Sequence, residues 1–349
     1  MHPDKPIHRG RAAATTAFSR QIISRLLAAC VLSALPMTTA GWAQTLPAAL
    51  VPPPAGRALV MPFESTTHDR RMVWLGEASA LLLADDLNAL GIPAITREER
   101  QRAFERLQVP HSATLTDATV IRLGQLVGAG EVVVGSLDLA GDTLTVRVRS
   151  ITLDTGRMRT VAEERGPVEE LFVTFERVAR QIASGSTRST EEVERQHPPL
   201  PAFESYIKGL LAETPATQAM YLQAALTLHP PFDRARLALW DVYVDQGEHA
   251  RALAAVRAVP ADSPVTRHAR FLEGLSLLHL KKLDEAFAIF KSLADTQPEA
   301  AVLNNLGVVQ LRRGGAGAMG RPSELFNRAV QTDADDPRAG CVPSRQLCL

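Results

Sequence analysis

Residues 232–298 read FDRARLALWDVYVDQGEHARALAAVRAVPADSPVTRHARFLEGLSLLHLKKLDEAFAIFKSLADTQP. This stretch contains two segments that superimpose at a shift of 34 residues. Small, large apolar and proline positions recur in the same order: Ala252, Val256 and Pro264, then Ala286, Phe290 and Pro298. A period of this length with a fixed order of small and large side chains indicates a repeated helical hairpin. The sequence therefore predicts a short helical solenoid in the carboxyl-terminal half.

The same pattern extends over residues 202–337. A helix pair is expected at 202–211 and 216–228, two regular repeats follow, and a fourth begins at Ala301 with a Gly-rich insertion at 314–317. Gly274 or Gly307 is expected to let the paired helix approach, and the gap is expected to be filled by Ala252, Ala286, Phe290 and Phe326. This half resembles the tetratricopeptide repeat family, except that Trp240 stands where a small residue is usual and Glu273 where a Leu is usual. The resemblance implies an all-α tetratricopeptide-repeat solenoid with an open concave face.

Residues 57–184 have a different pattern, in which short apolar runs alternate with helical segments. Strands are predicted at 58–61, 92–95, 131–139, 143–153 and 157–163, and helices at 74–90, 96–107, 117–127 and from Pro167 onward. The apolar positions change parity within 143–153, so we expect a bulge near Ser150. Together these elements predict an α+β two-layer domain with a mixed sheet.

The order of motifs in this region resembles the amino-terminal α/β domain of TolB-type envelope proteins. The motifs are Met61-Pro62-Phe63, Leu123 to Ala129, Val133-Val134-Gly135-Ser136 and Leu153-Asp154-Thr155-Gly156. TolB itself continues into a β-propeller, whereas this chain becomes helical. The resemblance implies a non-catalytic module for assembly or recognition in the cell envelope.

Residues 1–43 have the features of a signal peptide: a basic region ending at Arg25, an apolar run at 26–35 and small residues up to Ala43. We expect cleavage before Gln44 and a periplasmic or secreted product. Lipoprotein anchoring at Cys30 is the less favoured alternative, because the apolar run would lie mostly after that cut. The ten apolar residues at 26–35 cannot cross about 30 Å of hydrocarbon, so they are not expected to form a membrane helix. No stable transmembrane segment is expected after signal removal.

Polar or Pro-rich segments separate and end the two domains. Residues 44–56 are expected to form a Pro-rich linker, 185–201 a second linker, and 338–349 an irregular tail. Cys341 and Cys348 form either a disulfide or two free thiols. The helix after 337 does not develop, so either an apolar flank of the last repeat stays open for self-association or a partner, or the product is truncated.

Charge and motifs exclude several classes of function. The chain has 38 basic and 38 acidic residues, and residues 1–43 hold five of the basic and one of the acidic residues, so the remainder carries a net charge of −4. A mildly acidic protein has no general electrostatic reason to bind nucleic acid. The glycines at 124–130 precede a strand, which does not fit a dinucleotide loop. No nucleophile elbow or zinc spacing is visible, so we expect no enzyme activity, metal or cofactor.

The concave face of the repeats is therefore the expected functional surface, and its partners are expected to be other proteins or peptides. Counting along the first helix of each repeat places ten side chains there: Tyr206, Arg234, Asp241, Asp245, His268, Phe271, His279, Asn304, Asn305 and Arg312. For Tyr206 and Phe271, packing between repeats is an equal alternative. The favoured function is a protein-binding scaffold of the bacterial envelope. The alternative is a sensor in which the α/β domain binds a small molecule or glycan and the repeats relay the signal.

Overall fold

A computed structural model describes residues 56–66, 72–109, 115–183, 197–314 and 321–335. The predicted signal peptide, its cleavage site and the alternative at Cys30 lie outside the described residues. So do nearly all of the first linker, most of the second, the tail and its two cysteines.

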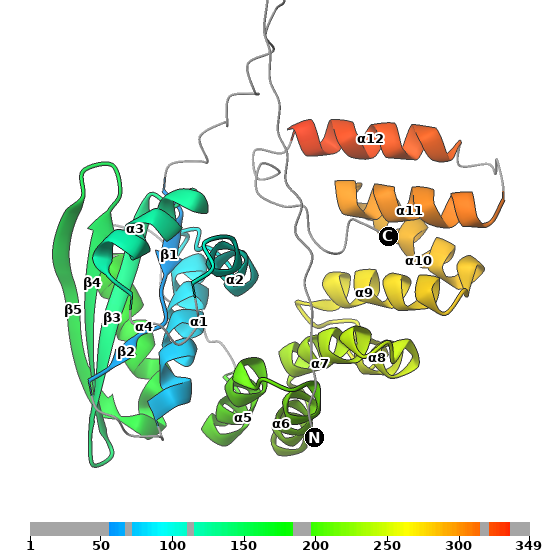
Figure 1. The fold of residues 1–349 in the computed structure, drawn as a ribbon. Helices are drawn as coiled ribbons and strands as arrows, with labels where there is room; N and C mark the ends of the chain where they lie inside the picture. Colours follow the sequence, from blue (N-terminus) through cyan, green and yellow to red (C-terminus); the bar gives the residue numbers. More distant parts are fainter. Residues whose placement is uncertain (1–55, 67–71, 110–114, 184–196, 315–320, 336–349) are drawn as a thin grey trace, which may run out of the picture. The chain divides into compact units, whose positions relative to one another are not determined.

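A mixed five-stranded sheet forms the framework of the amino-terminal domain (Figure 1). Its strands are β1 (Ala58–Val60), β2 (Glu64–Ser65), β3 (Glu131–Ala140), β4 (Thr143–Thr152) and β5 (Arg157–Pro167). Strands β1 and β2 pair with β3 in parallel, whereas β3, β4 and β5 form an antiparallel meander. The strands predicted at 131–139 and 143–153 are therefore confirmed as a hairpin, and Gly141 in its turn has the positive φ of +63° that favours glycine.

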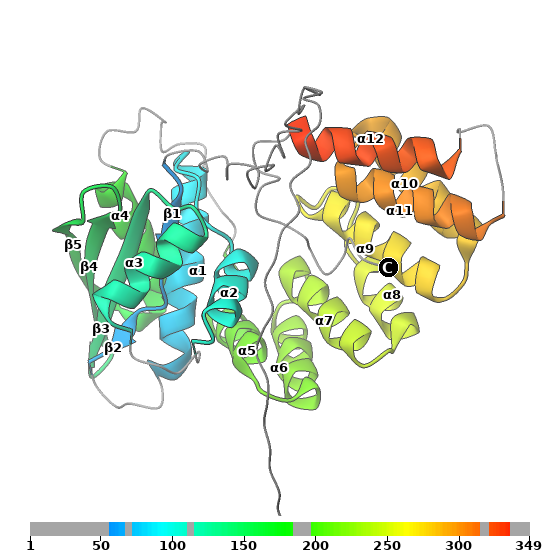
Figure 2. The same ribbon diagram turned by 45° about the horizontal axis from the view of Figure 1, so that its top comes forward.

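Helices cover both faces of this sheet. Helices α1 (Val73–Ala89) and α4 (Leu171–Ile182, after a 3-10 turn at Val168–Glu170) pack on one face. Helices α2 (Arg97–Arg106) and α3 (Asp117–Leu126) cover the other face near β1 and β3. Figure 2 shows α3 in front of the sheet and α4 behind it. The predicted α+β domain with a mixed sheet is therefore present, and α2 begins with a capping box formed by Thr96 and Glu99.

Two local predictions in this domain need correction. The bulge does not lie on β4: its pairing with β3 is regular, and the extra residue is Val161 of β5. The apolar side chains change parity because Ile151 pairs with Val132, which belongs to the core under α2 and α3. The predicted strand at 92–95 is a single bridge between Ala94 and Ala58, and Pro93 has no N–H with which to continue the ladder.

The described residues of the carboxyl-terminal half form four helix pairs, as the period predicts (Figure 1). They are α5 (Leu200–Leu211) with α6 (Pro215–Leu228), α7 (Asp233–Asp245) with α8 (His249–Arg257), α9 (Thr266–His279) with α10 (Leu283–Thr296), and α11 (Ala300–Arg312) with α12 (Pro322–Asp335). Each helix packs against the next along the chain. The series has the arrangement of a tetratricopeptide-repeat solenoid.

Glycines facing large side chains hold three of these pairs together. A Cβ added to Gly274 would lie 2.7 Å from the Phe290 ring, and one added to Gly307 would lie 2.7 Å from the ring of Phe326. Gly209 makes the same close approach to Leu222. A larger residue at any of these three positions would have to displace the facing side chain, which accounts for the small residue that these three pairs share.

In the second helix pair the large side chain lies on the first helix and the smaller one on the second. Trp240 occupies the glycine position, and Val256 occupies the position of the phenylalanine. The Trp240 indole is buried and donates a hydrogen bond of 2.7 Å from Nε1 to Oγ of Ser276 in the next repeat. Glu273, the second departure, is also buried and pairs with Arg257 at 2.8 Å. Trp240 therefore provides a polar link between α7 and α9, and Glu273 provides one between α9 and α8.

The two halves of the described chain share one apolar core. Helix α1 contacts α5, and the Phe203 ring lies edge-on to Trp74 at 6.5 Å and to Phe172 at 5.2 Å between ring centroids. All three side chains are buried or half-buried. The first repeat is therefore packed directly on the α/β domain.

Candidate functional site

The first helices of the repeats form the inner side of the array. Helix α7 contacts α9, and α9 contacts α11, in addition to their contacts with the second helices. The second helices of successive repeats approach each other less closely. An array whose first helices lie closer together curves toward them, so α7, α9 and α11 line the inner face, and α5 is the corresponding first helix of the first pair.

Six of the ten predicted site residues are exposed on these helices. They are Arg234, Asp241, Asp245, His268, His279 and Arg312. Asn304 is half-buried. Whether these residues bind a partner stays a prediction, but the structure places their side chains where a partner can reach them.

The other three predicted site residues are buried and are corrected here. Tyr206 packs against Phe232 with 4.9 Å between ring centroids, and Phe271 lies edge-on to Phe290 at 5.7 Å. The Asn305 side chain donates a 2.9 Å hydrogen bond to the Ala301 carbonyl one turn earlier in its own helix. Helix–helix packing therefore uses the aromatic residues that the sequence suggested as anchors, which is the packing alternative stated above.

The structure also assigns Arg234 a partner within the chain. Its guanidinium pairs with Asp85 of α1. A second link joins the same two halves: Arg97 of α2 donates a 3.0 Å hydrogen bond from Nη2 to the carbonyl of Leu210 in α5. Arg234 and Arg97 thus each form a polar contact between the α/β domain and the repeats.

Nothing in the sequence indicated that α2 contributes to the inner face. Glu98, at the start of α2, lies close enough to act electrostatically on four predicted site residues: Tyr206, Arg234, Asp241 and His268. These residues belong to α5, α7 and α9. Within the described residues, Glu98, Asp241 and Asp245 form no ion pair. The inner face near the first three repeats therefore carries unneutralised negative charge.

The carboxyl group of Asp241 responds most strongly to this environment. Desolvation by the surrounding protein raises its pKa to about 7, and the negative charges of Glu98 and Asp245 add to the increase, which Arg97 partly opposes. The side chain still contacts solvent, so water screens part of the unfavourable charge. The group is therefore partly protonated near neutral pH.

A pH-dependent stability follows from Asp241. Since its pKa is higher in the folded state than the ordinary 3.8, the folded protein holds a proton that the unfolded chain releases, and stability falls as pH rises from about 4 to about 7. We expect Asp241→Asn to raise the melting temperature at pH 8 and to have a smaller effect at pH 5. Thermal unfolding at both pH values measures this, with Glu213→Gln, in the turn after α5, as the control. An equal effect of Asp241→Asn at both pH values would contradict the assignment.

A second group of site residues meets near the last turns of α9 and α11. The His279 ring stacks on His249 of α8, with 4.1 Å between centroids. Burial lowers the pKa of His279, and the nearby His249 and Arg312 lower it further. Nδ1 of His249 is buried without a hydrogen-bond partner. The neutral imidazole of His279 is therefore favoured.

In the described part of the chain, no three His, Cys, Asp or Glu side chains come together as metal ligands. No helix in the same residues is both long and apolar enough to span a membrane.

Neither a scan against models of protein families nor a search of curated proteins gives a match to this chain. Among solved structures, it is similar to MamA (residues 41 to the end) from Desulfovibrio magneticus RS-1, with 17% identity, 48% of this chain and 93% of that chain covered, and a TM-score of 0.35. It is also similar to YrrB, a TPR protein with an unusual peptide-binding site, with 21% identity, 49% and 81% coverage and a TM-score of 0.34. The C-terminal domain of LpoB from Salmonella enterica shows 14% identity, 32% and 81% coverage and a TM-score of 0.23.

Proposed function

We propose that this chain is an exported, non-catalytic protein of the bacterial cell envelope, in which a TolB-like α/β domain carries a repeat array that binds a basic polypeptide segment. The observation that carries the proposal is the pair of exposed carboxylates, Asp241 and Asp245, on the inner side of α7. Glu98 of α2 adds a third carboxylate close to Asp241.

Charge complementarity identifies the partner's chemistry. The three carboxylates lie at or near the inner side of the array and have no ion-pair partner among the described residues, whereas the nearby Arg234 and Arg97 are already paired with Asp85 and Glu77. A lysine or arginine side chain of a partner would relieve the repulsion between the carboxylates. An extended segment suits a face built from parallel helix edges, because its side chains can meet successive repeats.

Export is supported by the amino-terminal sequence. Residues 1–43 combine a basic region, an apolar run and a small-residue cleavage pattern. The motifs at 61–63, 123–129, 133–136 and 153–156 support the TolB-like assignment. Recovery of the mature chain only from the cytoplasm would contradict the export.

Charge reversal on the inner face tests the proposed binding. We expect full-length protein with Asp241→Lys and Asp245→Lys to lose at least tenfold in affinity for a partner captured from envelope extracts, because both substitutions repel a basic segment. Binding by the unchanged protein should weaken as salt increases. Affinity is measured by surface plasmon resonance, and the melting temperature of each variant is measured in parallel.

The matched control reverses two acidic residues in loops of the same array, Glu213→Lys and Asp262→Lys, both of which are exposed. This control should bind as the unchanged protein does. If it loses as much affinity as the inner-face variant, net charge alone governs binding and the proposed site is wrong.

A further inference from the structure

Three equivalent positions on the inner-face helices differ in charge. They are the last residues of α7, α9 and α11, namely Asp245, His279 and Arg312. Each stands two positions before the residue of positive φ that follows its helix, which is Gly247, Lys281 or Gly314. All three side chains are exposed. The same place in successive repeats puts them in one row along a margin of the inner face, with an acidic residue at one end and a basic residue at the other.

The two ends of this row are too far apart to neutralise each other. Packed helices lie about 8–10 Å apart, so Asp245 and Arg312, with α9 between their helices, are separated by about 20 Å. Exposed charges are largely screened from each other beyond about 8 Å at physiological ionic strength. Within the described residues, neither side chain forms an ion pair. Each end of the row therefore carries a charge that a partner can meet.

The stability of α7 does not explain Asp245. The carboxyl end of a helix carries a partial negative charge, which disfavours an acidic side chain there. Asp241, one turn earlier on the same helix, adds a like charge. A cationic side chain of a partner would relieve both effects, so this end of the row fits a lysine or an arginine.

The other end of the row gathers basic groups. His279 stacks on His249 with 4.1 Å between ring centroids, and both His249 and Arg312 are close enough to lower the pKa of His279. The next residue, Arg313, already pairs with Asp284 at 2.8 Å. Arg312 thus remains as the cation available to a partner, and a carboxylate matches the geometry of its guanidinium.

We propose that the polypeptide segment bound by the inner face carries both charges: a basic side chain at Asp245 and, about six residues along, an acidic side chain at Arg312. The spacing follows because an extended chain advances about 3.3 Å per residue, so about six residues cover the distance between the two ends of the row. The neutral His279 lies between them, so the middle of the segment needs no charge. The acidic residue, its spacing and its contact with Arg312 go beyond the proposed function, on which they rest.

Three fluorescein-labelled synthetic peptides test this charge pattern: KKTSTSTEE, its reverse EETSTSTKK, and the uniformly basic KKTSTSTKK. Their affinities for the full chain are measured by fluorescence anisotropy at about 50 mM salt, where exposed charges are less screened than at physiological salt. We expect one of the two mixed-charge peptides to bind at least fivefold more tightly than the basic peptide, because it meets a complementary charge at both ends of the row. The direction of the bound chain decides which of the two it is. Binding of KKTSTSTKK at least as tight as that of both mixed-charge peptides would overturn the proposal.

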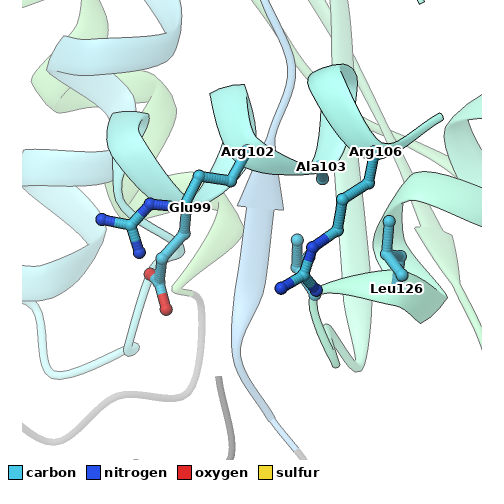
Figure 3. Close-up of a pocket in the computed structure, with 6 residues that line it drawn as sticks. Glu99, Arg102, Ala103, Arg106 and Leu126 are labelled. Atoms are coloured by element: carbon cyan, nitrogen blue, oxygen red, sulfur yellow. The ribbon is translucent and has the colours of Figure 1, made fainter. Parts of the chain in front are cut away.

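A charge reversal at Arg312 locates the acidic contact. With Arg312→Glu, the preferred mixed-charge peptide should lose at least fivefold in affinity, and KKTSTSTKK should bind more tightly. Arg106→Glu is the matched control, since Arg106 is also an exposed arginine at the last residue of a helix, α2. Figure 3 shows Arg106 beside Leu126, at a pocket on the α/β domain. The control should change neither affinity, and thermal unfolding checks that both variants are folded. Equal effects of the two variants, or no effect of Arg312→Glu, would contradict the proposal.

The inner-face variant with Asp241→Lys and Asp245→Lys distinguishes failure of this proposal from failure of the proposed function. If that variant weakens KKTSTSTKK but neither mixed-charge peptide binds the unchanged protein more tightly than KKTSTSTKK does, the inner face binds basic segments and only the acidic contact is wrong. If the variant weakens none of the peptides, the proposed function fails, and the acidic contact at Arg312 fails with it.

Discussion

Replacing Phe290 with alanine is expected to lower the free energy of unfolding by about 3–5 kcal/mol, since large-to-small changes at a fully buried phenylalanine leave a cavity. The Phe290 side chain is buried completely, lies edge-on to Phe271, and fills the space above Gly274. Urea unfolding followed by circular dichroism measures the change. Phe287→Ala, one turn earlier and only half-buried, is the matched control and should cost much less.

A substitution at Gly274 tests whether this residue and the Phe290 ring depend on each other for stability. Alanine is favoured over glycine within a helix by about 1 kcal/mol. Gly274→Ala should nevertheless destabilise the protein, by about 1–3 kcal/mol, because the added Cβ would meet the Phe290 ring. In the Phe290→Ala background the same change should become neutral or stabilising. If the changes in unfolding free energy of the two substitutions simply added, the contact between Gly274 and Phe290 would not be the cause of the destabilisation by Gly274→Ala.

The second large effect is expected at a buried charge cluster that joins α1 to α2. Glu77 pairs with Arg97 at 2.8 Å and also with Arg100, which is 3% exposed and donates a 3.1 Å hydrogen bond to the carbonyl of Val60. Burial lowers the pKa of Arg100, and the charge of Glu77 opposes that shift. Glu77→Gln leaves two arginines without a counter-charge and should cost about 3–5 kcal/mol in unfolding free energy.

Asp85→Asn is the control for that measurement. Asp85 pairs with Arg234, but the Arg234 side chain is 47% exposed, and exposed pairs contribute about 0–1 kcal/mol. Chemical denaturation of both variants under the same buffer conditions compares them. A cost for Glu77→Gln as small as that for Asp85→Asn would mean that water reaches the buried cluster.

Local patterns in the sequence were sufficient to predict most of the helices and strands. The recurrence of Ala252, Val256 and Pro264 as Ala286, Phe290 and Pro298 identified the hairpin repeats. This signal is local, because a ring such as that of Phe290 contacts Gly274 within its own pair of helices. The capping box of Thr96 and Glu99 is equally local. Both kinds of signal arise from residues close in sequence, which a single chain displays directly.

Contacts between distant segments could not be predicted in this way. The position of Tyr206 on the first helix of its pair was correct, but the sequence does not reveal that the ring of Phe232, which lies beyond α6, packs against it. Likewise, Arg234 was placed correctly on α7 without any indication that Asp85, 149 positions earlier, is its partner. The role of Glu98 at the inner face was missed for the same reason. Long-range packing decides which polar side chains remain available.

The core shared by α1, α4 and α5 has a consequence for how this protein can be divided. Separating the chain between Ala183 and His197 would expose Trp74 and Phe172 on one fragment and Phe203 on the other. Each fragment alone would then expose an apolar surface to water, whereas the two fragments mixed together should reassemble. The segment that the sequence predicts to be a linker is therefore a poor place to divide the chain for expression of either half.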